Sequence, residues 1–82
     1  MAVRGYVLIE TEVGKAKSVG AHIGELTYDG AKVMAVDTVT GPYDVMVQIE
    51  ADDLDHLGNA ITGVQGVHGV QKTTTCLAVK LA

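Results

Sequence analysis

The alternation of apolar and polar residues along the chain predicts four strands. Residues 3–10 form a short run rich in β-branched and aromatic residues, apolar at both odd and even positions, which is typical of a strand covered on both faces. Residues 45–50 alternate with a period of two, and residues 31–40 and 70–81 are rich in residues that favour strands. The final residues either extend the last strand or form a short extra one.

Between these strands the apolar positions recur every three or four residues, which predicts two helices. The first covers residues 14–26 and the second opens at Asp52 and Asp53, where a carboxylate can cap free N–H groups and suits the positive end of the helix dipole. The two predicted apolar stripes consist of Ala16, Val19, Ile23 and Leu26 in the first helix, and Leu54, Leu57, Ile61 and Val64 in the second.

The resulting βαββαβ order, with right-handed crossovers, predicts a ferredoxin-like α+β fold: a four-stranded antiparallel sheet with both helices on one face. If Val7 and Val47 meet the helices, then Tyr6, Leu8 and Met46 lie on the uncovered face. An apolar sheet face of this kind is typical of an interface, and a single domain over residues 1–82 gains stability by associating. We therefore expect a homodimer or a larger assembly; the plainer alternative is a solvated face with a few exposed apolar groups.

Composition narrows the function classes. The net charge is −4 and the six Lys and Arg residues are scattered, which argues against a surface dedicated to nucleic acid. No apolar run approaches the roughly 18 residues of a membrane helix, the N-terminus has no signal-peptide layout, and the lone Cys76 allows no internal disulfide. These features predict a soluble cytoplasmic protein without membrane association.

The sequence holds no recognisable catalytic or metal-binding constellation. His22, His56 and His68 share no metal-ligand spacing, and no second cysteine accompanies Cys76. We therefore expect no metal site, no cofactor and no enzymatic activity.

The turn from Thr40 to Asp44 combines features that suit ligand binding. Gly41 allows a ligand to approach the backbone closely, Tyr43 offers a flat wall and a hydroxyl, and Asp44 can accept hydrogen bonds from an ammonium group or brace the loop's own N–H groups. The plainer interpretation is that Gly, Pro and Asp are good turn residues and that Tyr43 simply packs. The threonine run 73–75 leaves the same choice between ligand contact and plain strand formation.

Several segments together resemble one known family. Val39-Thr-Gly-Pro-Tyr-Asp-Val-Met-Val resembles the VTGxYD stretch in the effector-binding domain of the Lrp/AsnC transcriptional regulators. Residues 6–15 resemble that domain's opening strand and helix start, residues 51–57 its second helix, and residues 66–75 its closing strand. The similarity covers nearly the whole chain, in order and at matching spacing.

This resemblance implies the same βαββαβ fold, with dimers formed through the sheets and rings of dimers such as octamers or decamers. It also implies that amino acids or similar small effectors bind at contacts between dimers. The family's ligand loop corresponds here to Val39, Thr40, Gly41, Tyr43 and Asp44, and its closing-strand hydroxyls correspond less directly to Thr73 and Thr75. Pro42 occupies the variable position x of the VTGxYD stretch.

Family regulators usually carry a helix-turn-helix domain before this one, whereas the first strand here begins at Val3. The resemblance therefore suggests a stand-alone form that does not bind nucleic acid directly and acts as a sensor or accessory module, including by co-assembly with full-length Lrp/AsnC regulators. Two alternatives stay open: a small enzyme on a dimeric α/β barrel of the same topology, and an ACT-type regulatory domain, whose ligand loops would lie nearer Gly14.

Overall fold

The computed structural model describes residues 2–79 and contains the expected six elements. In chain order these are β1 (Val3–Thr11), α1 (Ala16–Glu25), β2 (Ala31–Thr38), β3 (Val45–Ala51), α2 (Leu54–Gln65) and β4 (Val70–Leu77). The second strand ends two residues earlier than predicted, at Thr38. The closing strand ends at Leu77, and the part of the predicted strand, or extra strand, at residues 80–82 lies outside the described residues.

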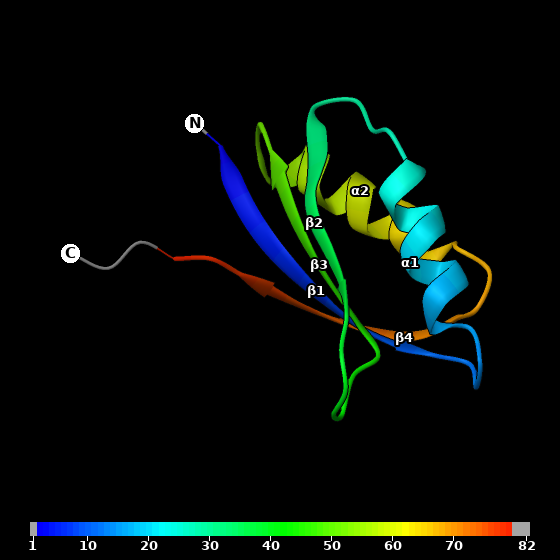
Figure 1. The fold of residues 1–82 in the computed structure, drawn as a ribbon. Coiled ribbons are helices and arrows are strands. Elements are labelled where there is room, and N and C mark those ends of the chain that lie inside the picture. Colours follow the sequence, from blue (N-terminus) through cyan, green and yellow to red (C-terminus); the bar gives the residue numbers. More distant parts are fainter. Residues whose placement is uncertain (1, 80–82) are drawn as a thin grey trace.

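The four strands form one antiparallel sheet in the order β2-β3-β1-β4, so β1 and β3 lie in the centre and β2 and β4 at the edges. Both helices pack on the same face of the sheet, and the other face is uncovered (Figure 1). This is the ferredoxin-like arrangement, and it confirms the predicted fold class.

The hydrophobic core lies between the helices and one face of the two central strands. In the register of β1 with β3, Val7 is opposite Val47 and Ile9 is opposite Val45, and all four side chains are buried. Because side chains alternate across a strand, burial of this set directs their neighbours to the uncovered face. The helices contribute the other core residues, chiefly Val19, Ile23, Leu57, Ala60 and Val64.

One residue of the predicted helix stripes is misplaced. Leu54 was expected to face the core, but it is the first residue of α2 and 59% exposed. A side chain at a helix start has no preceding turn to lie over, and the fully buried residues of α2 are Leu57, Ala60 and Val64. The small side chain of Ala60 gave a weaker apolar signal than Leu54.

The N-terminus of α2 is capped as predicted. Asp53 Oδ1 accepts a hydrogen bond from the backbone N–H of His56 at 2.8 Å and lies 2.7 Å from the Nδ1 atom of the same residue. The hydrogen bond and negative charge of Asp53, with smaller contributions from the charges of Asp29 and Asp52, raise the pKa of His56 above its ordinary value of 6.5. The imidazolium form of His56 therefore stabilises the folded chain.

This pair predicts a pH dependence of stability. A raised pKa in the folded state means that the stabilisation is fully present below about pH 6.5 and is lost as the pH rises through the folded-state pKa of His56. We expect urea denaturation at fixed protein concentration to give a lower free energy of unfolding at about pH 8 than at about pH 6. His56→Gln should flatten this dependence, whereas the control His22→Gln should keep it. An unchanged slope in His56→Gln would show that the pair does not contribute.

Candidate functional site

The candidate ligand loop, residues 39–44, connects β2 to β3 at one end of the sheet. It is closed by a backbone hydrogen bond of 2.9 Å from the Val39 N–H to the Asp44 carbonyl. Thr40 and Gly41 are exposed, Tyr43 is half-buried, and Gly41 has a φ of 137°, which favours glycine. The backbone of Gly41 is thus open to solvent, and the partly buried ring of Tyr43 follows two residues later.

Asp44 fastens this loop to the end of β1. Its Oδ2 atom accepts hydrogen bonds from the backbone N–H of Thr11 at 2.8 Å and from the Thr11 hydroxyl at 3.2 Å. Its own N–H donates to the Ile9 carbonyl at 2.8 Å. The carboxylate therefore braces a neighbouring strand through one oxygen.

The structure places Thr73 and Thr75 on the helix-facing side of β4. Thr73 is opposite Ile9 and Thr75 is opposite Val7, the two buried residues of β1. The Gln65 side-chain amide donates a hydrogen bond of 3.0 Å to the Thr73 hydroxyl. Since Ile9 also pairs with Val45, Thr73 lies in the same row of the sheet as the loop's end, with β1 between them. Thr75 lies two residues further along β4, opposite Val7.

Thr11 is the residue that sequence reasoning missed. It stands one position beyond the strand predicted to end at Glu10, and its contact with Asp44 spans 33 residues. Neither spacing nor composition signals such a contact. The available clue was general: a backbone N–H at the end of a strand, such as that of Thr11, needs an acceptor from outside the sheet.

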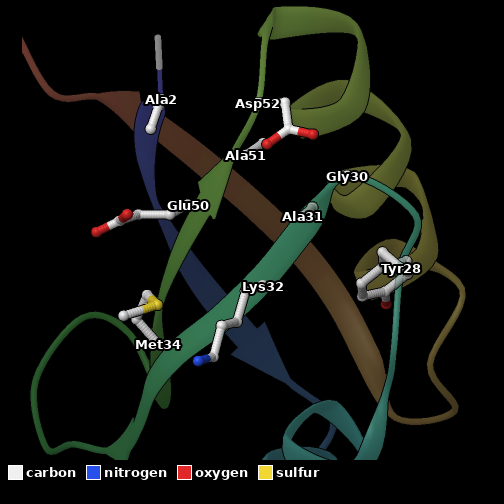
Figure 2. Close-up of a pocket in the computed structure, with 9 residues that line it drawn as sticks. All are labelled: Ala2, Tyr28, Gly30, Ala31, Lys32, Met34, Glu50, Ala51 and Asp52. Atoms are coloured by element: carbon white, nitrogen blue, oxygen red, sulfur yellow. The ribbon is translucent and has the colours of Figure 1, made fainter.

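Three hollows lie away from the loop. One of about 460 Å³ is at the opposite end of the sheet (Figure 2), lined by Ala2, Tyr28, Gly30, Ala31, Lys32, Met34, Glu50, Ala51 and Asp52. The Tyr28 hydroxyl is buried with no hydrogen-bond partner among the described residues, and burial raises the pKa of this phenol. A second hollow, of about 540 Å³, lies at the C-terminal ends of both helices and includes His22 and His68. Neither contains a residue of the predicted site.

The uncovered sheet face has the composition that was predicted. Tyr6 and Leu8 are half-buried and Met46 is 39% exposed, while Val7 and Val47 beneath them are buried. A third, smaller hollow of about 120 Å³ on this face is lined in part by Tyr6 and Met46. An ion pair of 3.0 Å between Arg4 and Glu50 lies at one end of the face. The face is thus an apolar surface with a charged margin.

No helix within residues 2–79 combines the length and apolar character needed to cross a bilayer. The same described residues contain no cluster of three or more histidine, cysteine or acidic side chains suited to a metal ion.

The contacts of Asp44 predict a loss of stability when its side chain is truncated. Asp44→Ala leaves the Thr11 N–H and hydroxyl without their acceptor, which should lower the free energy of unfolding by about 1–3 kcal/mol. Glu25→Ala, which removes an exposed acid at the end of α1, is the matched control and should change stability little. Urea denaturation measures both, and an Asp44→Ala protein as stable as wild type would contradict the bracing role.

Comparison with known proteins gives these features a context. The crystal structure of TTHA0845 from Thermus thermophilus is 31% identical, covers 98% of this chain and 96% of that one, and superposes with a TM-score of 0.85. The crystal structure of the transcriptional regulator NMB0573 in complex with L-Met, from Neisseria meningitidis, is 16% identical, with a TM-score of 0.77 over 95% of this chain and 50% of that one. At that identity it shows similarity of fold.

A curated relative and a family model complete the comparison. The homocitrate synthase of Sulfurisphaera tokodaii is 38% identical over 48 residues, which are 58% of this chain but only 10% of that enzyme. The sequence model of the Lrp/AsnC ligand binding domain matches residues 5–81 and so includes the candidate loop, all of β3 and all but the first two residues of β1. The chain therefore belongs to the Lrp/AsnC ligand binding domain family.

Proposed function

We propose that this chain binds an amino acid or a similar small effector at a site shared between subunits, and acts as a sensor or accessory module in transcription regulation. The observation that carries the proposal is the family match over residues 5–81, which includes the loop from Val39 to Asp44. The related fold of NMB0573, described in complex with L-Met, supports an amino acid as the ligand.

The chemistry of the loop suits an amino acid. A ligand ammonium group needs an anionic acceptor, and the half-buried Asp44 carboxylate has one oxygen outside its bonds to Thr11. The exposed backbone at Gly41 allows close approach of a ligand, and the Tyr43 ring provides a partly sheltered wall. Thr73 and Thr75 are the proposed further hydroxyl contacts from β4.

A second subunit would complete this site. In one chain the loop residues Thr40 and Gly41 face solvent, and β1 separates the loop from Thr73, so one chain supplies only one wall. We propose that dimers form through the uncovered sheet faces and meet one another at the loops, in a ring-like octamer or decamer. Co-assembly with full-length Lrp/AsnC regulators would use the same surfaces, without direct contact of this domain with nucleic acid.

We further propose that residues 1–82 form a single effector-binding domain with a regulatory and not a catalytic role. The similarity to homocitrate synthase covers one tenth of that enzyme and carries no argument for its chemistry here. The family itself is defined by ligand binding.

The proposed dimer predicts the effect of a charge on the uncovered face. Leu8 lies in the middle of this face, opposite Met46 on β3 and Thr74 on β4. Leu8→Lys should reduce the mass measured by light scattering toward the 8.5 kDa of one chain, because burying an unpaired ammonium group at an interface is costly. Leu54→Lys, which changes an exposed leucine on α2, should keep the wild-type mass. An assembled Leu8→Lys protein, or a monomeric wild type, would contradict the proposed interface.

The proposed ligand predicts a thermal-shift result. In a screen of the twenty proteinogenic amino acids, at least one should raise the melting temperature of the wild-type protein, because a ligand that binds only the folded state stabilises it. Asp44→Asn, which removes the charge but keeps an oxygen, should weaken that shift, whereas the control Asp55→Asn on α2 should retain it. A wild type that responds to none of the twenty would refute the amino-acid proposal.

A further inference from the structure

The end of β1 leaves a backbone N–H to be satisfied outside the sheet. Odd-numbered residues of β1 direct their backbone groups toward β3, as the bond from the Asp44 N–H to the Ile9 carbonyl shows. The paired part of β3 begins only at Val45, opposite Ile9, so Thr11 extends beyond the last partner in the ladder. A buried or half-buried N–H at such a position needs another acceptor.

The Asp44 side chain supplies that acceptor with a single oxygen. Both donors of Thr11, its N–H and its hydroxyl, reach Oδ2, at 2.8 and 3.2 Å. No hydrogen bond joins Oδ1 to a donor within residues 2–79. Because donors to an sp2 oxygen prefer to lie near the plane of its group, two donors on Oδ2 favour one orientation of the carboxylate and so of Oδ1.

Among residues 2–79, no cationic side chain forms an ion pair with Asp44. The ion pairs within the described residues join Arg4 to Glu50 and His56 to Asp53, and neither involves Asp44. Its carboxylate is half-buried, and the donors that reach it in the described part of the chain are the neutral N–H and hydroxyl of Thr11. A partly desolvated carboxylate of this kind gains most from a cationic partner.

Thr11 itself is firmly placed. The strand pairing with β4 shifts register between Glu10 and Thr11, and the next residue, Glu12, donates its N–H to the Gly69 carbonyl at 2.9 Å. The end of β1 and the residue after it are therefore attached on one side to Gly69, which directly precedes β4, and on the other to Asp44 of the candidate loop. This anchoring makes Thr11 a fixed support for a side chain that comes from a more exposed loop.

We propose that Thr11 is a positioning residue for effector recognition: it holds Asp44 through Oδ2 so that Oδ1 is presented to the ammonium group of the ligand. This inference rests on the proposed amino-acid function and adds the residue that orients its anionic group. In this proposal, the pair of Asp44 and Thr11 distinguishes an amino acid from an analogue that lacks the ammonium group.

The test compares Thr11→Val with Thr11→Ser. Thr11→Val keeps the backbone bond and the branched shape but loses the hydroxyl donor, whereas Thr11→Ser keeps the hydroxyl. Thr27→Val is the matched control, since Thr27 is exposed and belongs to the connection between α1 and β2. Figure 1 shows this connection at the end of the molecule opposite the loop. Light scattering and circular dichroism first establish that each variant assembles and folds as the wild type does.

Calorimetric titration then uses the amino acid that gives the largest thermal shift among the twenty, beside its analogue with hydrogen in place of the ammonium group. We expect Thr11→Val to weaken binding of the amino acid by about five- to tenfold and to leave binding of the analogue unchanged. Thr11→Ser and Thr27→Val should bind the amino acid as wild type does. This pattern separates positioning from a general loss of structure, which would weaken both ligands.

Two outcomes would overturn the inference, and they differ from each other. Equal affinity of wild type and Thr11→Val for the amino acid, or equal weakening of amino acid and analogue, would remove Thr11 from recognition while leaving the proposed function in place. A wild type that binds none of the twenty amino acids would instead refute the proposed function itself, and the role of Thr11 with it.

Discussion

Burial of one face of β1 and β3 beneath the two helices is the constraint on which the rest of this structure depends. Val7, Ile9, Val45 and Val47 are in register and inaccessible to solvent, and the alternation of side chains then determines what the opposite face carries. A slip of one residue would bring Tyr6 and Gln48 into the core and expose the valines. The same constraint determines where β3 begins, and so where the loop from β2 must end.

Much of the fold could be predicted from the sequence, because local pattern and global topology agree. Valine and isoleucine at alternate positions, apolar stripes at helical spacing and an aspartate at the start of α2 all correspond to elements of the structure. The exceptions are local: Leu54 is exposed because a helix start has no preceding turn to cover, and β2 ends at Thr38 although strand-forming residues continue. A strand ends where its partner strand stops pairing with it, and the periodicity of one segment carries no information about its partner.

The candidate site was predictable only in part, for a physical reason. The residue types of the loop suggested a ligand site, but the partner of Asp44 is Thr11, which lies 33 residues away in the sequence and is brought close by the pairing of β1 with β3. Of the two roles open for this carboxylate, an acceptor for ammonium or a brace, the structure shows a brace to Thr11 that still leaves one oxygen available. Likewise, the threonines of β4 could be placed on a strand from sequence, whereas their facing required the register with Val7 and Ile9.

That register gives the three consecutive threonines of β4 different surroundings. Thr73 and Thr75 are on the side of the helices, and Thr74 pairs with Leu8 on the uncovered face. Identical neighbours in the sequence thus belong to different surfaces of the molecule. In evolution, selection on Thr74 would depend on its contacts at the uncovered sheet face, whereas selection on Thr73 would depend on its contacts with α2. The three threonines can therefore diverge independently of one another.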